Sequence, residues 1–295
     1  MQQVVILAST AGWHTDELVR AVSARGLVPL LLPWEANVGR MGLGSGVQNT
    51  GHLLRGARAV LARIIPSGSL EQIIYRVDTL HRLQEDGVRV MNSASAIERT
   101  VDKAWTSAIL DRAGLPTPET VTCESADDAF AAFRAMGDVV VKPLFGSMGL
   151  GMSRVSDEDM AWRVFRVVET IRGVYYLQKF IPHEGRDVRA FVIGGRVLGA
   201  IERSAPGWRT NFSRGGSVKP FTLPAAWDDL AVRAAAAVGA EYAGVDLLPA
   251  SDGAVYVLEV NGIPGWEGLQ KATGIDVAGA VVDQLLTSEY RVPST

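Results

Sequence analysis

The 295-residue sequence predicts an α/β (α+β) protein with mixed sheets, and three local patterns lead to this fold class. Residues 3–32 show strand, helix and strand in turn, as at the start of a parallel sheet. From residue 185 onward, two apolar strands are joined by Gly194 and Gly195, which is typical of an antiparallel hairpin. The remaining chain, to about residue 287, alternates strands with helices, and no repeat or low-complexity segment interrupts it.

The N-terminal third alternates short strands with amphipathic helices. We expect strands at 3–9, 27–32 and 88–92, and helices at 15–25, 70–87 and from Ala96 to Gly114. Thr15 opens the first helix and Gly26 closes it, and Pro33 ends the second strand. Residues 35–51 are polar and rich in glycine, so we expect a mobile loop or irregular excursion there.

A second unit begins after residues 115–120, where two prolines stiffen an extended connection. Its expected elements are helices at 126–136 and 157–172 and strands at 139–142 and 174–181.

Composition excludes several classes of protein. The net charge of −3 and the lack of a lysine or arginine run disfavour nucleic acid and a membrane surface as partners. The early apolar run lacks a basic flank, so we expect a cytoplasmic protein. Cys123 has no second cysteine to pair with, and a partly buried thiol is favoured over a zinc ligand. The four histidines are scattered and predict no site.

The segment "VVVKPLFGSMGLG" at 139–151 predicts a buried strand that ends at Lys142 and runs into a glycine-rich loop. Backbone N–H groups of such loops bind anions, so a phosphate site is the first hypothesis. A Walker loop needs the lysine after its glycines, and a dinucleotide fingerprint needs its glycines between the first strand and helix. Neither pattern fits, and a glycine turn with a solvated lysine stays open.

A hairpin near the C-terminus predicts a metal site. Residues 252–253, Asp-Gly, are a preferred two-residue turn, and counting outward from them places Asp246 opposite Glu259. Asn261 shares their face, and two carboxylates with an amide oxygen suit Mg²⁺. The alternative is a bulge or another register, which Pro249 would permit, with one carboxylate facing solvent.

Three arginines, at 203, 209 and 214, lie between these two segments, within residues 201–217. Arginine binds anionic oxygens with two parallel donors, so together with Asn211 they suit a site for carboxylate and phosphate. The alternative is that they are ordinary solvated loop residues.

Taken in order, these motifs resemble the RimK-like branch of the ATP-grasp superfamily. The matching stretches are "VDK", "VVVKPLFGSMGLG", "YLQKFI", "GRDVRAFV", "RTNFSRGG" and "GVDLL…VLEVNGIPGWEG", within about residues 90–287. The resemblance implies an ATP-grasp fold with ATP clamped between two mixed or antiparallel sheets. It also implies three domains: an N-terminal α/β domain at 1–98, a central domain at 99–182 and a C-terminal domain at 183–295.

The resemblance also implies site residues. It makes Lys103 and Lys142 the lysines that contact the ATP phosphates. It makes the loop of Gly146, Ser147, Gly149 and Gly151 the flap over them. The implied adenine hinge is Gln178, Lys179 and Ile181, and Asp187 is the implied ribose contact. The implied phosphate and acyl-phosphate contacts are Arg203, Arg209, Thr210 and Asn211, and the implied Mg²⁺ ligands are Asp246, Glu259 and Asn261.

The implied activity is an ATP-dependent ligase that joins a carboxylate to an amine through an acyl phosphate. Lys142, Arg203, Arg209 and Asn211 are its implied catalytic residues, with ATP and two Mg²⁺ ions, for which Mn²⁺ substitutes. Several phrases are most similar to ligases that add L-glutamate to tetrahydromethanopterin, which implies small-molecule acid and amino-acid substrates. A protein tail, carrier protein or peptide as acceptor stays open. Residues 35–51 have no counterpart in the ribosomal-protein modifying members, so the resemblance does not identify the substrate. A nucleotide-binding regulator without turnover and a homo-oligomer also stay open.

Overall fold

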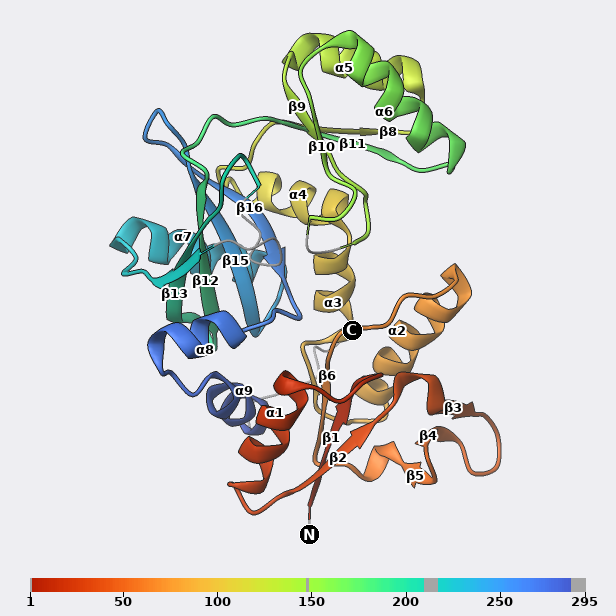
Figure 1. The fold of residues 1–295 in the computed structure, drawn as a ribbon. Coiled ribbons are helices and arrows are strands. Elements are labelled where there is room, and N and C mark those ends of the chain that lie inside the picture. The colour runs from red at the N-terminus through yellow and green to blue at the C-terminus, as the bar shows by residue number, and fades with distance from the viewer. Residues whose placement is uncertain (1, 147–148, 210–216, 288–295) are drawn as a thin grey trace.

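The structure is a computed structural model that describes residues 2–146, 149–209 and 217–287 (Figure 1). Its described strands form one parallel sheet and three antiparallel sheets, with helices packed against the larger ones. The predicted α/β (α+β) class is confirmed, although strand direction differs between sheets and not within any one of them.

The parallel sheet is formed by the N-terminal part of the chain, in the order β2-β1-β6-β7. Its strands are β1 (Gln3–Leu7), β2 (Val28–Leu32), β6 (Ala59–Ala62) and β7 (Val90–Met91). Helices α1 (Trp13–Ser23) and α2 (Leu70–Glu85) connect them. The inner strands β1 and β6 are apolar on both faces from Val4 and Ala59 onward because both faces are buried, whereas the edge strand β2 is partly buried. One face of this sheet shares an apolar core with β12 (Arg186–Ile193) and α9 (Val277–Leu286).

Residues 35–51 are not an irregular excursion, and that prediction was wrong. They contain a short helical turn, η1 (Trp34–Ala36), and two strands of a small sheet whose order is β3-β4-β5. The strands are β3 (Asn37–Arg40), β4 (Gly46–Asn49) and β5 (His52–Leu53), followed by the turn η2 (Leu54–Gly56). The buried amide of Asn49 donates to Pro33 O and Asn37 Oδ1, and the Tyr75 hydroxyl of α2 donates to Asn37 O. The polar residues therefore hold the segment in place.

The single helix expected from Ala96 to Gly114 is two helices, α3 (Ala94–Val101) and α4 (Lys103–Arg112). Asp102 lies between them with extended backbone dihedrals, and its carboxylate accepts hydrogen bonds from the backbone N–H groups of Ala104 and Trp105. An aspartate at this position caps a new helix start. The break makes Lys103 the first residue of α4, where its side chain lies near the glycine-rich loop.

The second sheet has the antiparallel order β10-β9-β11-β8. Its strands are β8 (Thr120–Cys123), β9 (Val139–Val141), β10 (Ser153–Val155) and β11 (Tyr175–Lys179). Helices α5 (Ala126–Met136) and α6 (Glu158–Thr170) cover one face (Figure 1), and their apolar sides meet the strands in a separate core. The opposite face is therefore left toward the third sheet.

The third sheet has the antiparallel order β14-β13-β12-β15-β16. Its strands are β12 (Arg186–Ile193), β13 (Arg196–Ser204), β14 (Ser217–Pro220), β15 (Tyr242–Pro249) and β16 (Val255–Asn261). The helices around it are α7 (Ala225–Ala237), α8 (Glu267–Thr273) and α9 (Val277–Leu286). The predicted hairpin turn is confirmed: Gly194 and Gly195 join β12 to β13 with φ of +55° and +76°. Such dihedrals favour glycine at both positions.

Asn92, which follows β7, connects the parallel sheet to the third sheet by hydrogen bonds. Its amide nitrogen donates to Tyr242 O at 2.8 Å and Gly262 O at 2.6 Å, and its amide oxygen accepts from the N–H groups of Glu241 and Tyr242. The side chain is fully buried, and all four of these bonds are made. Because Gly262 directly follows Asn261, this contact fixes the end of β16 where a metal ligand is predicted.

The domain boundaries after residues 98 and 182 stay predictions. Among the described residues, none of the helices combines the length and the apolar character needed to span a bilayer.

Candidate active site

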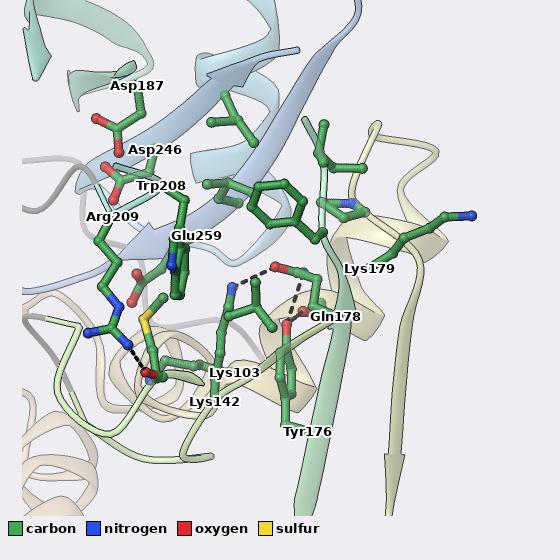
Figure 2. Close-up of a pocket in the computed structure, with 18 of the residues that line it drawn as sticks. Lys103, Lys142, Tyr176, Gln178, Lys179, Asp187, Trp208, Arg209, Asp246 and Glu259 are labelled. Atoms are coloured by element: carbon green, nitrogen blue, oxygen red, sulfur yellow. Dashed lines mark hydrogen bonds between the residues drawn. The ribbon is translucent and has the colours of Figure 1, made fainter. Parts of the chain in front are cut away.

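A cavity lies between the second and third sheets, at the open face of β9 and β11 (Figure 2). Ten of the predicted site residues line it: Lys103, Lys142, Gln178, Lys179, Ile181, Asp187, Arg203, Arg209, Asp246 and Glu259. These residues come from α4, both sheets and the loops between them, so only the folded chain brings them together. Gly146, Gly149, Gly151 and Asn261 are not part of its lining. Ser147, Thr210, Asn211 and Arg214 lie outside the described residues.

Charged side chains of alternating sign cross the third sheet, and Asp187, Arg203 and Asp246 among them line the cavity. Asp187 on β12 faces Arg203 on β13, and their bidentate hydrogen bonds are both 2.7 Å long. Arg189 on β12 faces Asp246 on β15 with two bonds of the same length. Arg203 also reaches Asp246 at 2.9 Å. Directly opposed strand positions place such pairs within reach, and bidentate geometry makes them strong.

Burial and the two arginines have opposite effects on the pKa of Asp246. Burial alone would raise the pKa of the Asp246 carboxyl, but the charges and hydrogen bonds of Arg189 and Arg203 outweigh it and hold that pKa below its usual range. Asp246 is therefore ionised at neutral pH.

The pairing of Asp246 with Glu259 is confirmed, but the turn from which it was counted is not. Near the turn, Pro249 pairs with Val255, so five residues connect the strands in place of two. A register shift next to Asp246 then leaves Leu258 as an extra residue and restores the predicted partner. The predicted pairing is therefore correct because the longer connection and the extra residue at Leu258 offset each other in the register.

Glu259 differs from the acids on β12 and β15. Among the described residues, no hydrogen bond or ion pair engages its carboxylate. The two guanidiniums offset two of the three carboxylates on this wall, so the remaining negative charge is at Glu259. The repulsion between Asp246 and Glu259 is therefore relieved by arginines, and a metal ion is not needed to explain their pairing.

The donor set still fits a hard cation. Glu259 offers an unpaired carboxylate, Asp246 lies directly opposite it, and both are oxygen ligands of the kind that Mg²⁺ prefers. Asn261 pairs with Gly244, two residues along the same strand, and its amide oxygen accepts one hydrogen bond from Ile263 N–H at 2.9 Å. One lone pair of that oxygen remains for a ligand.

Lys142 follows the last residue of β9, and its ammonium points into the cavity (Figure 2). Its Nζ donates to Gln178 Oε1 at 2.5 Å and lies 5.7 Å from the centre of the Tyr176 ring. Burial lowers the pKa of Lys142 from 10.5 to about 8, although Glu259 and Asp246 act to raise it. Among the described residues, the hydrogen-bond partner of this ammonium is thus an uncharged amide and not a carboxylate.

Both described ends of the glycine-rich loop are held by predicted phosphate ligands. The Lys103 ammonium donates to Gly146 O at 2.6 Å, and the Arg209 guanidinium donates to Met152 O. Gly146, Gly149 and Gly151 have φ of +131°, +67° and +75°, which favour glycine. The described ends of the loop are therefore held by two cations that line the cavity.

The predicted adenine hinge lines the opposite end of the cavity. Val140, Leu248 and Leu258 are apolar residues that line the cavity, together with Phe180 and Ile181 of the hinge segment. The N–H of Lys179 donates to Glu119 O and the N–H of Phe180 to Asp138 O, so these two donors are already used by the sheet. The Lys179 side chain points away from the cavity (Figure 2). This end suits a flat apolar group, whereas the opposite end suits anions.

Sequence reasoning missed several contributors to the site, among them Ser107, Met152, Tyr176 and Arg189, and His183 lines the cavity although no site was predicted for the histidines. Arg189 had a signal, because it lies two residues after Asp187 on one strand and shares its face. Ser107 and Tyr176 had none, since their contact at 2.8 Å joins α4 to β11 across 69 residues.

A cavity between two antiparallel sheets, with a glycine-rich loop and lysines at one end and carboxylates on the facing wall, defines an ATP-grasp protein. The RimK-like ATP-grasp domain model matches residues 100–285, and the chain belongs to this family, whose members are ATP-dependent ligases that use ATP and Mg²⁺.

Relatives extend over nearly the whole chain. The tetrahydromethanopterin:alpha-L-glutamate ligase of Methanosarcina acetivorans is 32% identical, and the match covers 95% of this chain and 97% of the relative. A probable alpha-L-glutamate ligase of Thioalkalivibrio sulfidiphilus is 33% identical, covering 95% and 94%. The ATP-grasp ligase PsnB, solved with minimal precursor, Mg and ADP, has a TM-score of 0.74 at 23% identity, covering 96% and 97%. This last likeness concerns the fold alone.

Proposed function

We propose that this protein joins an amino acid, with L-glutamate as the first candidate, to a small-molecule carboxylate such as a tetrahydromethanopterin-type cofactor. The observation that carries the proposal is the cavity lined by both Lys142 and Glu259, neither of which forms an ion pair among the described residues. The names of the 32% and 33% identical relatives support glutamate as the amino acid.

The chemistry requires activation of the acid, because an amine does not displace oxide from a carboxylate. A carboxylate oxygen attacks the γ-phosphorus of ATP, the bond from phosphorus to the β-bridging oxygen breaks, and ADP leaves. The amine nitrogen then attacks the acyl carbon, the amide bond forms, and phosphate leaves while the amine loses a proton. Phosphoryl transfer of this kind depends mainly on alignment and charge stabilisation.

The residues of the cavity suit these two demands. In this scheme Lys142 donates to phosphate oxygens at one end, and Lys103 and Arg209 join it there while holding the glycine-rich loop. Mg²⁺, held by Asp246, Glu259 and Asn261, supplies charge neutralisation on the phosphates when bound. Loop closure over the cavity keeps water from the acyl phosphate.

The test is a panel of acids and amines supplied with ATP and Mg²⁺, scored by ADP release and by product mass. We expect ADP release that depends on both L-glutamate and a pterin-type acid, with a product heavier by one glutamyl residue. Replacing L-glutamate by D-glutamate or L-aspartate in the same panel controls for the choice of amino acid.

Other outcomes would redirect or end the proposal. ADP release with peptide or carrier-protein acceptors alone would move the activity to protein modification. Tight ATP binding with no acceptor-stimulated ADP release from any member of the panel would indicate a regulator and contradict the ligase proposal.

A further inference from the structure

The side chain of Gln178 is oriented by a chain of hydrogen bonds that begins outside the cavity. Thr120 Oγ1 on β8 donates its one hydrogen to Pro118 O at 2.8 Å. That oxygen can then only accept from its other neighbour, Gln178 Nε2, which lies 3.1 Å away. The nitrogen end of the Gln178 amide therefore faces β8, and its oxygen must face the other way.

The oxygen end of this amide faces Lys142. An ammonium has three donors and no acceptor, so it requires an oxygen at this position, and the Nζ–Oε1 distance is 2.5 Å. Gln178 Nε2 also lies 3.2 Å from the Tyr176 hydroxyl (Figure 2). That hydroxyl is hydrogen-bonded to Ser107 on α4. In this series of hydrogen bonds, the Thr120 hydroxyl and the Gln178 amide each donate to an oxygen. The amide orientation that allows this presents Oε1 to the lysine.

Burial leaves the amide little freedom to leave this arrangement. Gln178 is 2% exposed and Tyr176 is 1% exposed, so rotating the amide would bury unpaired polar groups. Lys142, by contrast, is a long flexible side chain that has no ion-pair partner among the described residues. One bond to Oε1 leaves its two other N–H donors directed at the cavity.

We infer that Gln178 is a positioning residue that fixes the ammonium of Lys142 for the ATP phosphates, and that it acts through this lysine and not by contacting the nucleotide base. This inference rests on the proposed nucleotide site. It adds a residue that orients Lys142 without contacting the nucleotide itself.

The test is a double-mutant cycle measured by calorimetric titration of ATP with Mg²⁺. Gln178→Leu removes the acceptor, and we expect it to weaken ATP binding about tenfold. In a Lys142→Met background the same change should alter affinity less than twofold, because the side chain on which it acts is absent. An equal loss in both backgrounds would overturn the inference. Failure of the wild-type protein to bind ATP would instead overturn the proposed site.

A second variant separates positioning from damage to the fold. Thr120→Val removes the acceptor that orients the amide and leaves Gln178 in place. We expect a smaller loss of ATP affinity, about threefold, that again disappears with Lys142→Met. Gln178→Glu keeps an oxygen toward Lys142 and should bind ATP better than Gln178→Leu. The matched control is Gln48→Leu, on β4 and away from the cavity, which should leave affinity unchanged.

If Gln178 instead contacted the adenine base, the affinities for adenosine and for ATP would change together. Adenosine lacks the phosphates, so its displacement of a labelled nucleotide should be the same for Gln178→Leu and the wild type. A loss of adenosine affinity equal to that for ATP would overturn the positioning role.

Discussion

Two groups of charged side chains share one cavity but differ in how they are compensated. The paired group consists of Asp187, Arg189, Arg203 and Asp246. The open group consists of Lys103, Lys142 and Glu259. Each member of the first has a charged partner within 2.9 Å, whereas the lysines of the second bind only uncharged oxygens among the described residues. Removing one partner of a buried ion pair is costly, so we expect changes in the paired group to reduce stability. Under the proposed function the open group binds a charged ligand, so we expect changes there to reduce activity.

The largest effect expected from this comparison is on activity. Lys142→Ala should lower ADP formation about a thousandfold, since it removes an ammonium aimed at the transferred phosphoryl group. The unfolding temperature should stay the same or rise, because burial disfavours this charge in the free protein. Steady-state kinetics and thermal unfolding of one preparation measure both. Normal ADP formation by the folded variant would contradict the site.

The next effect concerns the paired group and is a loss of stability. Asp187→Ala removes the bidentate partner of the buried Arg203 and should cost about 3–5 kcal/mol of the free energy of unfolding. Asp159→Ala removes an exposed ion pair with Arg163 and should cost less than about 1 kcal/mol. Denaturant unfolding compares the two variants. Equal losses would show that the paired group does not stabilise the fold as argued.

A smaller effect is expected from Glu259→Gln, which keeps the shape of the side chain and removes its charge. The Mg²⁺ concentration for half-maximal activity should rise at least tenfold, because a ligand charge is lost. Stability should not fall, since the carboxylate has no described partner. Glu158→Gln, on the exposed start of α6, is the matched control. An unchanged magnesium dependence would remove Glu259 from the metal site.

The fold was predictable where hydrophobic pattern and turn chemistry agreed. The β1-α1-β2 unit and the Gly194-Gly195 hairpin were correct because short-range sequence determines them. Residues 35–51 were misread because their strands are short and their order depends on distant contacts, such as Tyr75 with Asn37. The helix break at Asp102 had a local signal, a capping aspartate inside an amphipathic run, that was passed over.

The site was predictable in its residues but not in its pairings. Asp246 and Glu259 could be placed opposite each other from the sequence. No local sequence pattern predicts that Arg189 and Arg203 both contact Asp246. Arg189 lies 57 residues away on the neighbouring strand β12, and Arg203 lies 43 residues away on β13, so only the folded sheet brings them together. The same holds for the amide of Gln178, whose orientation depends on Thr120 and Pro118.

The smallest predicted effect is a change of ATP affinity with pH, which should depend on the open group and not on the paired group. Burial lowers the pKa of Lys142 to about 8 in the free protein, so its ammonium is present at pH 7 and mostly lost at pH 9. ATP affinity should therefore fall up to about tenfold between these pH values, with proton uptake on binding at pH 9. The paired carboxylate Asp246 stays ionised throughout, since its pKa is lowered. Calorimetry in two buffers of different ionisation enthalpy measures both quantities. The decline should vanish in Lys142→Met, and an identical decline in that variant would assign the titration to another group.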